Sequence, residues 1–295
     1  MTARIIDGKH VAARIRQECR ERLETLRRHN GVVPGLAVIL VGENAASKVY
    51  VANKVRACAE VGIQSFKKEL PAGIDTDTLV SHIESLNRDP SINGILVQLP
   101  LPQHIDMRRV LSAIAAEKDV DGFHLYNVGG LVVGNTVFPP CTPYGVVRLL
   151  EHEGISVEAK NVVVVGASNI VGKPMALMLM QREATVSICH AKTRDLAQFT
   201  ILADILVVAA GKPNLILPQM VRTGAVVIDV GINRLPNGKL VGDVDFEGVR
   251  QKASYITPVP GGVGPMTVTM LLVNTITSAE RMAGLPTNAI VEEPA

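Results

Sequence analysis

Short runs of consecutive apolar residues, separated by segments of helical periodicity, constrain the fold of this chain most strongly. In the first half, the runs Leu36–Val41 and Gly94–Pro100 are bounded by glycine or proline, which is typical of strands buried on both faces. Helical patterns lie between them, at about residues 45–61 and 76–87. In the second half the strand-like runs are Val162–Val165, Thr185–Cys189, Asp204–Ala210 and Ala225–Val230. This alternation predicts an α/β protein with two lobes built on mainly parallel sheets.

The length of 295 residues favours two domains, because one hydrophobic core seldom serves so long a chain. Apolar residues at helical spacing predict an opening amphipathic helix that ends before Gly31. The motif PPCTP at Pro139–Pro143 interrupts the pattern before a helix expected at about residues 144–153. We therefore expect one domain over residues 1–140 and a second over 141–265. The apolar stretch 266–285 is expected to form a helix that packs back on the first domain.

Charge and composition exclude several classes of protein. Thirty basic and 28 acidic residues give a net charge of +2, and aromatic residues make up 3%, so the sequence lacks the basic surface and stacking platforms of a nucleic-acid-binding protein. The four cysteines show no CxxC spacing, which predicts reduced thiols and neither a disulfide framework nor a metal site. Asp7, Lys9 and His10 lie where a signal peptide would need an apolar core, and no apolar run reaches the roughly 18 residues of a membrane span. We expect a cytoplasmic enzyme without membrane contact.

The segment VVVVGASNIVGKP (Val162–Pro174) reads as a buried strand, a glycine turn and the start of a helix. This arrangement presents backbone N–H groups and a helix N-terminus to a pyrophosphate. Gly166 and Gly172 lie six residues apart, with Ala167 and Ser168 where a strict GxGxxG motif has its middle glycine. The motif alone is weak, and a turn without a ligand is the alternative. The preceding valines and the surrounding alternation favour a Rossmann-like dinucleotide-binding domain.

The turn after the next expected strand bears on the choice of cofactor. In nicotinamide-binding domains an acid at this place favours a free ribose 2′-hydroxyl, whereas a cation favours a 2′-phosphate. Here the turn reads His190-Ala191-Lys192-Thr193-Arg194, with no acid before Asp195. Lys192 and Arg194 therefore favour NADP, although a solvated basic turn remains the alternative for either residue alone.

Three further polar positions are candidates for a catalytic site. Tyr50 and Lys54 are four residues apart and so share one face of a helix; such a pair is also common on helix surfaces. Gln98 lies within an apolar run and needs hydrogen-bond partners, which Lys54 or the backbone can supply. In KDVDGF, Asp119 is expected to stabilise a turn, whereas Asp121 is a candidate to bind the N–H groups of a ligand.

The segment TPVPGGVGPMT (Thr257–Thr267) concentrates three prolines and three glycines. Glycine permits a positive φ and close approach to a ligand, and proline fixes the backbone on either side. We expect a shaped loop before a helix that begins at Met266. A tight turn without a ligand is the alternative.

These motifs, in this order, resemble the bifunctional methylenetetrahydrofolate dehydrogenase/methenyltetrahydrofolate cyclohydrolase family, the FolD family. The resemblance rests on SKVYVANK, QLPLP, KDVDGF, PCTP, VGASNIVGKPMA, VIDVGIN, VGDV and TPVPGGVGPMT. It implies that NADP⁺ oxidises 5,10-methylenetetrahydrofolate to the methenyl form in a cleft between the lobes. Hydrolysis then gives 10-formyltetrahydrofolate for one-carbon metabolism and purine biosynthesis. The resemblance also implies tetrahydrofolate derivatives as ligands and a homodimer.

The resemblance assigns roles to individual residues. Lys54 is the expected proton-transfer group of the hydrolysis, and Gln98 would orient it. Tyr50 would stack along the folate, and Asp121 would hold the amino-pyrimidine edge of the pterin. The expected loop residues at the substrate are Val259, Pro260, Gly261 and Gly262. The expected cofactor contacts are Gly166, Ala167, Ser168, Ile170, Lys192 and Ile232.

The sequence departs from some relatives at Ala167 and Ala191, where they carry arginine and serine that help to hold the 2′-phosphate. Use of NAD therefore remains possible. Two other classes of protein are the alternatives. A regulatory nucleotide-binding protein without catalysis would not need Lys54, Gln98 and Asp121, and all three are present here. A short-chain or hydroxy-acid dehydrogenase is disfavoured because here the Tyr/Lys pair precedes the glycine turn and lies in the other lobe.

Overall fold

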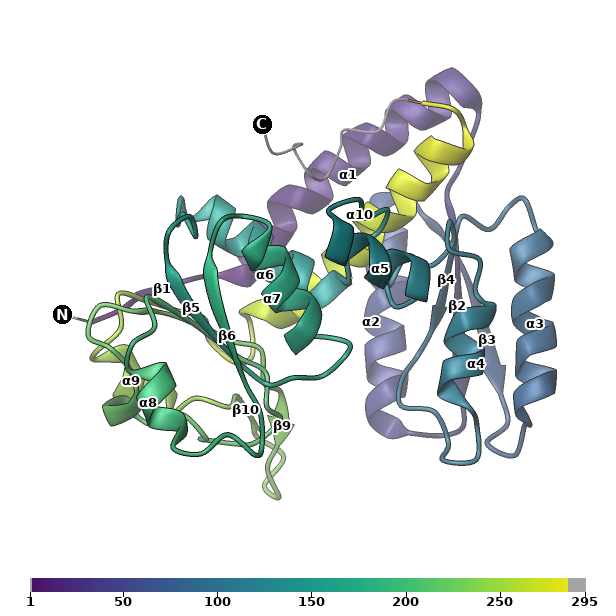
Figure 1. The fold of residues 1–295 in the computed structure, drawn as a ribbon. Coiled ribbons are helices and arrows are strands. Elements are labelled where there is room, and N and C mark those ends of the chain that lie inside the picture. Colours follow the sequence, from purple (N-terminus) through teal and green to yellow (C-terminus); the bar gives the residue numbers. More distant parts are fainter. Residues whose placement is uncertain (1, 286–295) are drawn as a thin grey trace. The chain divides into compact units, whose positions relative to one another are not determined.

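A computed structural model of the protein describes residues 2–285 and divides the chain into two compact units (Figure 1). The six-stranded unit comprises the residues up to Ala13 together with Pro140–Thr267. The three-stranded unit comprises Arg14–Pro139 and the chain from Val268 onward. Two of the three boundaries fall within long helices, α1 (Gly8–Asn30) and α10 (Val263–Met282), and the third lies between Pro139 and Pro140.

The three-stranded unit is built on a parallel sheet. Its central strand is β2 (Gly35–Val41), which pairs with β3 (Gln64–Leu70) on one side and β4 (Gly94–Val97) on the other. All seven residues of β2 are buried, because a central strand with helices on both faces has no solvent side. The two expected apolar strands are confirmed, and β3 is an additional strand at the edge.

Helices cover both faces of this sheet. The helices of the unit, besides the parts of α1 and α10, are α2 (Ala45–Val61), α3 (Thr76–Arg88), α4 (Met107–Ala113) and α5 (Leu125–Val133). Leu79 and Ile83 of α3 and Val110 of α4 pack in one core cluster with Ile39 and Ile95 of the sheet. In Figure 1, α2 lies on the opposite side of the sheet from α3. The predicted helices at residues 45–61 and 76–87 are confirmed.

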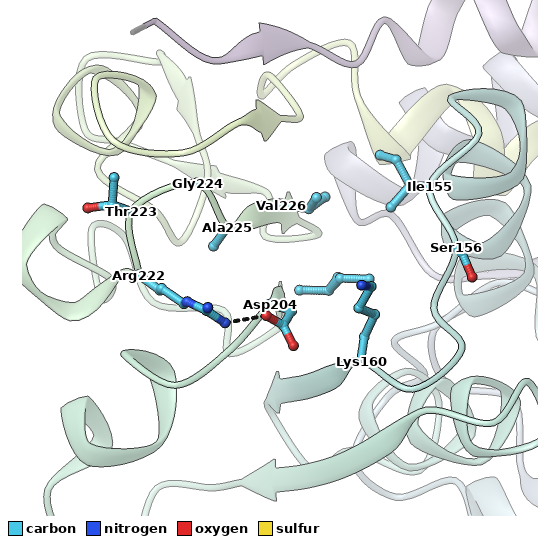
Figure 2. A pocket seen from close by; sticks show the side chains of 10 residues that line it. Ile155, Ser156, Lys160, Asp204, Arg222, Thr223, Gly224, Ala225 and Val226 are labelled. Atoms are coloured by element: carbon cyan, nitrogen blue, oxygen red, sulfur yellow. Dashed lines mark hydrogen bonds and ion pairs between the residues drawn. The ribbon is translucent and has the colours of Figure 1, made fainter.

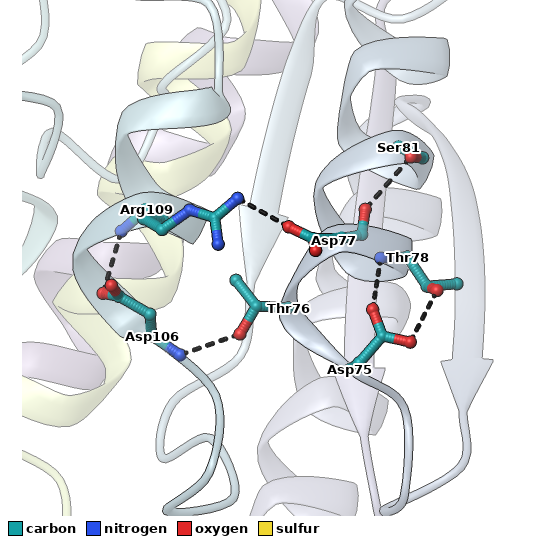
Figure 3. Close-up of polar contacts among 7 residues, drawn as sticks. All are labelled: Asp75, Thr76, Asp77, Thr78, Ser81, Asp106 and Arg109. Carbon is teal, nitrogen blue, oxygen red and sulfur yellow. Dashed lines mark hydrogen bonds and ion pairs between the residues drawn. The ribbon is translucent and has the colours of Figure 1, made fainter.

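Side-chain caps join the N-termini of α3 and α4 (Figure 3). Asp75 accepts the Thr78 N–H at 2.7 Å, and Asp106 accepts the N–H groups of two residues in the first turn of α4. The Asp106 N–H donates to Thr76 Oγ1 at 3.0 Å. Arg109 and Asp77 form an ion pair at 2.6 Å. The caps therefore satisfy the unpaired N–H groups of each helix, and the Asp106–Thr76 and Arg109–Asp77 contacts hold the two helix starts together.

The second half of α10 belongs to the core of the three-stranded unit. Asn274 Nδ2 donates to the Val120 carbonyl at 2.8 Å, and Ser278 Oγ donates to the Asn93 carbonyl at 2.6 Å. Both polar side chains are buried, and each satisfies a backbone group of a segment that precedes or follows β4.

The six-stranded unit contains one parallel sheet in the order β1-β11-β8-β7-β5-β6. Its strands are β1 (Arg4–Ile5), β5 (Asn161–Val165), β6 (Thr185–Cys189), β7 (Ile205–Val208), β8 (Val226–Asp229) and β11 (Tyr255–Ile256). The four strands expected from apolar runs are confirmed, whereas β1 and β11 are two-residue additions. The order reverses between β5 and β7, since the chain first adds β6 on one side and then β7 on the other. Such a switch point is where open α/β sheets bind ligands, at the carboxyl ends of the strands.

The remaining elements of this unit connect and cover the strands. They are α6 (Cys141–His152), α7 (Gly172–Met180), α8 (Leu196–Thr200), the short 3₁₀ helix η1 (Pro218–Met220), α9 (Phe246–Arg250) and an antiparallel hairpin of β9 (Asn233–Arg234) and β10 (Leu240–Val241).

The structure differs from the expected boundaries in three places. The residues up to Ala13 belong to the six-stranded unit, because β1 pairs with β11 at its edge. Helix α6 begins at Cys141, and α10 begins at Val263 rather than Met266. In both helices a proline lies in the first turn, where a missing N–H costs no helical hydrogen bond.

A surface pocket of about 250 Å³ lies at the amino edge of the six-stranded sheet (Figure 2). Lys160, Asp204 and Ala225 precede β5, β7 and β8, respectively, and line it. Asp204 pairs with Arg222 there. This edge is opposite to the one where parallel sheets bind nucleotides.

None of the helices in residues 2–285 combines the length and apolar character needed to cross a membrane.

Candidate functional site

Lys54 and Gln98 are in contact in the three-stranded unit. Lys54 lies on α2 and is half-buried, and its Nζ donates to Gln98 Oε1 at 3.0 Å. Gln98 Nε2 donates to the Leu99 carbonyl at 2.6 Å. Both ends of the amide therefore have a hydrogen-bond partner. The oxygen accepts from the lysine and the nitrogen donates to the backbone, so both of the partners considered for Gln98 are present.

The topology of the sheet explains why these residues meet. Gln98 follows β4 directly, and its N–H donates to the Ile39 carbonyl of β2 at 2.9 Å. Lys54 lies on the helix that follows β2. The strand order β3-β2-β4 reverses between β2 and β4, so the pair lies at the switch point of this sheet, on its carboxyl side. That is where an α/β sheet places a ligand site.

The two other candidates of this unit are partly accessible to solvent. Tyr50 is one turn before Lys54 on α2 and is 40% exposed, so its ring is available for stacking. Asp121 is half-buried. Asp119, by contrast, is buried and occupied, since it accepts the His124 N–H at 2.7 Å and the Asn127 amide at 2.8 Å. The expectation that Asp119 serves the local backbone is confirmed.

In the six-stranded unit, the turn after β5 is glycine-dependent because backbone segments meet there. Gly166 has a φ of +126°, and a Cβ on it would lie 2.2 Å from the Ala209 carbonyl oxygen at the end of β7. A Cβ on Gly172 would lie 1.9 Å from the Gly166 carbonyl oxygen. These two glycines therefore permit a tight turn and close packing of α7 on the sheet, which are two of the three roles of glycine in a dinucleotide-binding motif.

The same turn presents unpaired backbone donors. Ser168 Oγ accepts the Val171 N–H at 3.1 Å and so orders the start of α7. Within residues 2–285, the backbone N–H groups of residues 167–170 donate to no protein acceptor. Ser168 and Ile170 are exposed. A run of free N–H groups before a helix N-terminus, at a switch point, suits the binding of a pyrophosphate.

The turn after β6 holds the two candidate cations at the surface. The His190 N–H donates to Thr193 Oγ1 at 2.9 Å, and the Lys192 N–H donates to His190 Nδ1 at 3.2 Å, so the turn is ordered by its own groups. Lys192 and Arg194 are exposed, and neither side chain has a protein partner in the described part of the chain. Both are available to an anion.

The glycine-rich segment after β11 is a loop only up to Gly262. Val263, Gly264 and Pro265 form the first turn of α10, so the expectation that the loop continues up to Met266 is wrong. The Gly262 N–H donates to the Pro258 carbonyl at 2.8 Å. A Cβ on Gly8 of α1 would lie 1.8 Å from the Gly262 carbonyl oxygen. The loop is therefore packed tightly against the start of α1.

Sequence reasoning missed two buried acids next to Ile232. Asp229 ends β8 and is 3% exposed, and Asp243 follows β10 and is 0% exposed. Asp229 accepts N–H groups from Gly231, Asp243 and Val244 at 2.9–3.0 Å. An acid at the end of an apolar strand run was the available signal, because a buried carboxylate requires several donors. Ile232 itself is 44% exposed.

The environment of Asp229 changes its protonation. Burial raises the pKa of Asp229 to about 6, against the opposing effect of its three backbone N–H donors, and the neighbouring Asp243 carboxyl adds to the rise. The folded chain therefore holds a proton at Asp229 between about pH 4 and 6, whereas the unfolded chain releases it.

This shift predicts a stability that falls as the pH rises. For a carboxyl whose folded pKa is raised, the free energy of unfolding decreases through the window between the unfolded and folded pKa values. We expect the Asp229 contribution to fall by about 2 kcal/mol between about pH 4.5 and pH 7. Urea unfolding of the wild type and of Asp229→Asn at both pH values measures this. The wild type should lose more stability than the variant; an equal pH dependence of the two would contradict the assignment.

Within residues 2–285, no group of three or more histidine, cysteine, aspartate or glutamate side chains could hold a metal ion.

Comparison with family models gives matches over most of the chain. Residues 6–121 match the model "Tetrahydrofolate dehydrogenase/cyclohydrolase, catalytic domain", and residues 140–283 match the "NAD(P)-binding domain" model of the same family. The first range contains Lys54, Gln98 and Asp121. The second contains the turn after β5 and the two buried acids.

Individual proteins are similar over nearly their whole length. A "Bifunctional protein FolD" of Nitrosospira multiformis is 60% identical over 281 residues, which is 95% of this chain and 97% of that protein. The crystal structure of the Campylobacter jejuni FolD enzyme has a TM-score of 0.93 at 53% identity, covering 95% of this chain and 99% of that one. The Trypanosoma brucei FolD structure, a complex with NADP cofactor and inhibitor, has a TM-score of 0.92 at 42% identity and covers 95% and 98%.

Proposed function

Because the chain belongs to the tetrahydrofolate dehydrogenase/cyclohydrolase family, we propose that it oxidises 5,10-methylenetetrahydrofolate with NADP⁺ and hydrolyses the methenyl product to 10-formyltetrahydrofolate. The observation that carries this proposal is the contact of Lys54 with Gln98 at the switch point of the three-stranded sheet. Hydrolysis needs a group that moves protons, and the lysine is held where a ligand is expected.

The turn after β5 supports the binding of the cofactor. Its free N–H groups at residues 167–170 would hold the pyrophosphate, and Lys192 and Arg194 would hold the 2′-phosphate that distinguishes NADP from NAD. Ile232 would lie against the nicotinamide. When bound, the cofactor accepts the hydride from the methylene carbon, and the protein's part in that step is mainly to align the two rings.

The hydrolysis depends on a proton acceptor. Water adds to the methenyl carbon, and Lys54 Nζ takes a proton from that water as the carbon–oxygen bond forms. The hydroxyl group of this adduct then loses its proton as the bond between the carbon and N5 breaks, N5 takes up a proton, and the formyl group stays on N10. The hydrogen bond to Gln98 Oε1 fixes the orientation of the Lys54 amine, so that its other positions point in a defined direction.

We assign substrate contacts to Tyr50, Asp121 and the loop residues Val259–Gly262. The exposed Tyr50 ring would stack along the folate. Asp121 would accept two N–H groups from the amino-pyrimidine edge of the pterin. The loop would contact the reacting rings through its backbone, since two of its residues are glycines.

Replacing Asp121 with asparagine tests this assignment. An amide can accept only one of the two N–H groups and opposes the other, so folate affinity is expected to fall about tenfold or more in both reactions. The KM values for methylene- and methenyltetrahydrofolate measure it. Unchanged values would remove Asp121 from the substrate site.

Replacing Lys192 with methionine tests the cofactor preference. The variant loses the charge near the 2′-phosphate but keeps an unbranched side chain, so the KM for NADP⁺ should rise about tenfold or more while that for NAD⁺ stays within about twofold. Lys160→Met, at the opposite edge of the sheet, is the matched control and should change neither value. An equal effect of Lys192→Met on both cofactors would contradict the assignment.

The decisive experiment for the function mixes the purified protein with 5,10-methylenetetrahydrofolate and either NADP⁺ or NAD⁺. Reduced nicotinamide, methenyl and 10-formyl products are followed together. Formation of all three with NADP⁺ supports the proposal. Activity only with NAD⁺ would overturn the role of Lys192, and no activity with either cofactor would favour a regulatory nucleotide-binding protein.

We also propose that the protein is a cytoplasmic homodimer. The four cysteines are free and buried, which suits a reducing compartment. Strand β6 lies at an edge of the sheet. Exposed apolar residues lie in this strand and near it, namely Ile188 in the strand and Phe199, Ile201 and Leu202 nearby. A second copy would cover them. Light scattering on the wild type and on Leu202→Lys tests this, and a monomeric wild type would refute it.

A further inference from the structure

Two buried acids join the three loops at the carboxyl ends of β7, β8 and β11, and we propose that Asp243 is a positioning residue for hydride transfer. This inference rests on the proposed function. Both acids are buried, whereas Ile232 is exposed, so the acids would act without contacting the substrate.

Asp243 fixes the loops after β7 and β8. Its Oδ2 accepts the N–H groups of Ala210 and Gly211 at 2.7 and 2.8 Å, directly after β7. Its Oδ1 accepts from the side-chain amide of Asn233 at 2.8 Å, in the segment after β8. Its own N–H donates to Asp229 Oδ1 at 3.0 Å. One side chain therefore holds two adjacent loops and is held in turn by Asp229.

Asp229 extends the connection to the third loop. Its side chain accepts the Gly231 N–H at 2.9 Å, and its backbone N–H donates to Thr257 Oγ1 at 2.7 Å. Thr257 is fully buried and begins the glycine-rich loop after β11. Since β11, β8 and β7 are neighbours in the sheet, the two acids connect the loops that follow these three adjacent strands.

The arrangement leaves no space for adjustment. A Cβ on Gly231 would lie 2.3 Å from Asp243, and a Cβ on Gly242 would lie 1.8 Å from Asp229. Ile232 lies between the two anchored residues Gly231 and Asn233, and a Cβ on Gly264 would be 3.7 Å from its Cδ1. The two acids therefore anchor the residues on both sides of Ile232.

Stability alone does not explain these acids. In the described part of the chain, neither carboxyl forms an ion pair with a lysine, arginine or histidine. Burying a carboxyl without a cation is unfavourable, so a role in holding the nicotinamide end accounts for them better than fold stability does. Hydride transfer depends on ring alignment, and a misplacement of about 1 Å can lower its rate about 100-fold.

The test compares the two activities of one protein. Asp243→Ala leaves three donors unpaired, so we expect the kcat of hydride transfer to fall about 30-fold or more. Hydrolysis of added methenyltetrahydrofolate, which depends on Lys54 in the other unit, should stay within about twofold. Asp243→Asn should restore most of the hydride transfer, because its Oδ1 can accept the Ala210 and Gly211 N–H groups while the Asn233 amide rotates to accept from its Nδ2.

Asp204→Ala is the matched control. Asp204 lies at the opposite edge of the same sheet (Figure 2) and accepts the Asn161 N–H at 2.9 Å. Its replacement should therefore alter neither activity. If Asp243→Ala does not fold, Asn233→Ala removes one donor of the same group and should lower hydride transfer by a smaller factor. Equal loss of both activities, or no loss, overturns the inference. An inactive wild type would instead overturn the proposed function.

Discussion

Replacing Lys54 with glutamine should abolish hydrolysis of methenyltetrahydrofolate while hydride transfer persists. Glutamine is one atom shorter than lysine and retains an N–H donor for Gln98 Oε1, but it cannot take a proton from water. Loss of a general base lowers a rate by about 100- to 10,000-fold. We expect hydrolysis to fall within this range and hydride transfer to stay within about tenfold of the wild type, measured by methenyl decay and nicotinamide reduction.

Two further variants sharpen this result. Lys48 is an exposed lysine on the same helix that pairs with Glu43, and Lys48→Gln should leave both activities unchanged. Lys54→Arg keeps a positive charge and donors for Gln98 but cannot be deprotonated. It should therefore fail in hydrolysis as glutamine does. Hydrolysis by the arginine variant at near the wild-type rate would show that Lys54 acts by its charge and not as a base.

Gly172→Ala should remove most of the dehydrogenase activity by the addition of a single methyl group. The new Cβ would lie 1.9 Å from the Gly166 carbonyl oxygen, so α7 and the turn after β5 must move apart. Both belong to the proposed pyrophosphate site. We expect the affinity for NADP⁺ to fall about 100-fold and stability to fall by about 1–3 kcal/mol, as for an overpacked core.

The affinity for NADP⁺ can be titrated directly, and the hydrolysis of supplied methenyltetrahydrofolate provides the comparison. Hydrolysis should continue, since Lys54 and Gln98 lie in the other unit. Gly129→Ala is the matched control, because a Cβ there meets nothing within 4 Å. Near-normal NADP⁺ affinity in Gly172→Ala would mean that the turn does not bind the cofactor.

Most of the strands could be predicted from the sequence because they are buried on both faces. The run Val162–Val165, for example, is buried throughout and lies within β5. Strand β3 was missed, since its edge position leaves Lys67, Lys68 and Glu69 in a strand that lacks a continuous apolar run. Strands β1 and β11 have two residues each, which is too short for any periodicity.

The candidate site could be predicted only in part from the sequence. Lys54 was chosen from helical spacing and Gln98 as an amide in an apolar run, and their contact, one of the two alternatives for Gln98, is present in the structure. Asp229 and Asp243 were not chosen as a pair, because two acids fourteen positions apart carry no spacing signal for contact. Their meeting depends on the hairpin of β9 and β10, which returns the chain beside the end of β8.

The division of the chain limits how the protein can be dissected. The six-stranded unit needs the residues up to Ala13, and the three-stranded unit needs the chain from Val268 onward. A fragment that ends near Pro139 would lack Asn274 and Ser278, which satisfy buried carbonyls beside β4. Neither half can therefore be cloned as one uninterrupted reading frame, and limited proteolysis would not release either intact. Point substitutions, rather than truncations, are the means of separating the two activities.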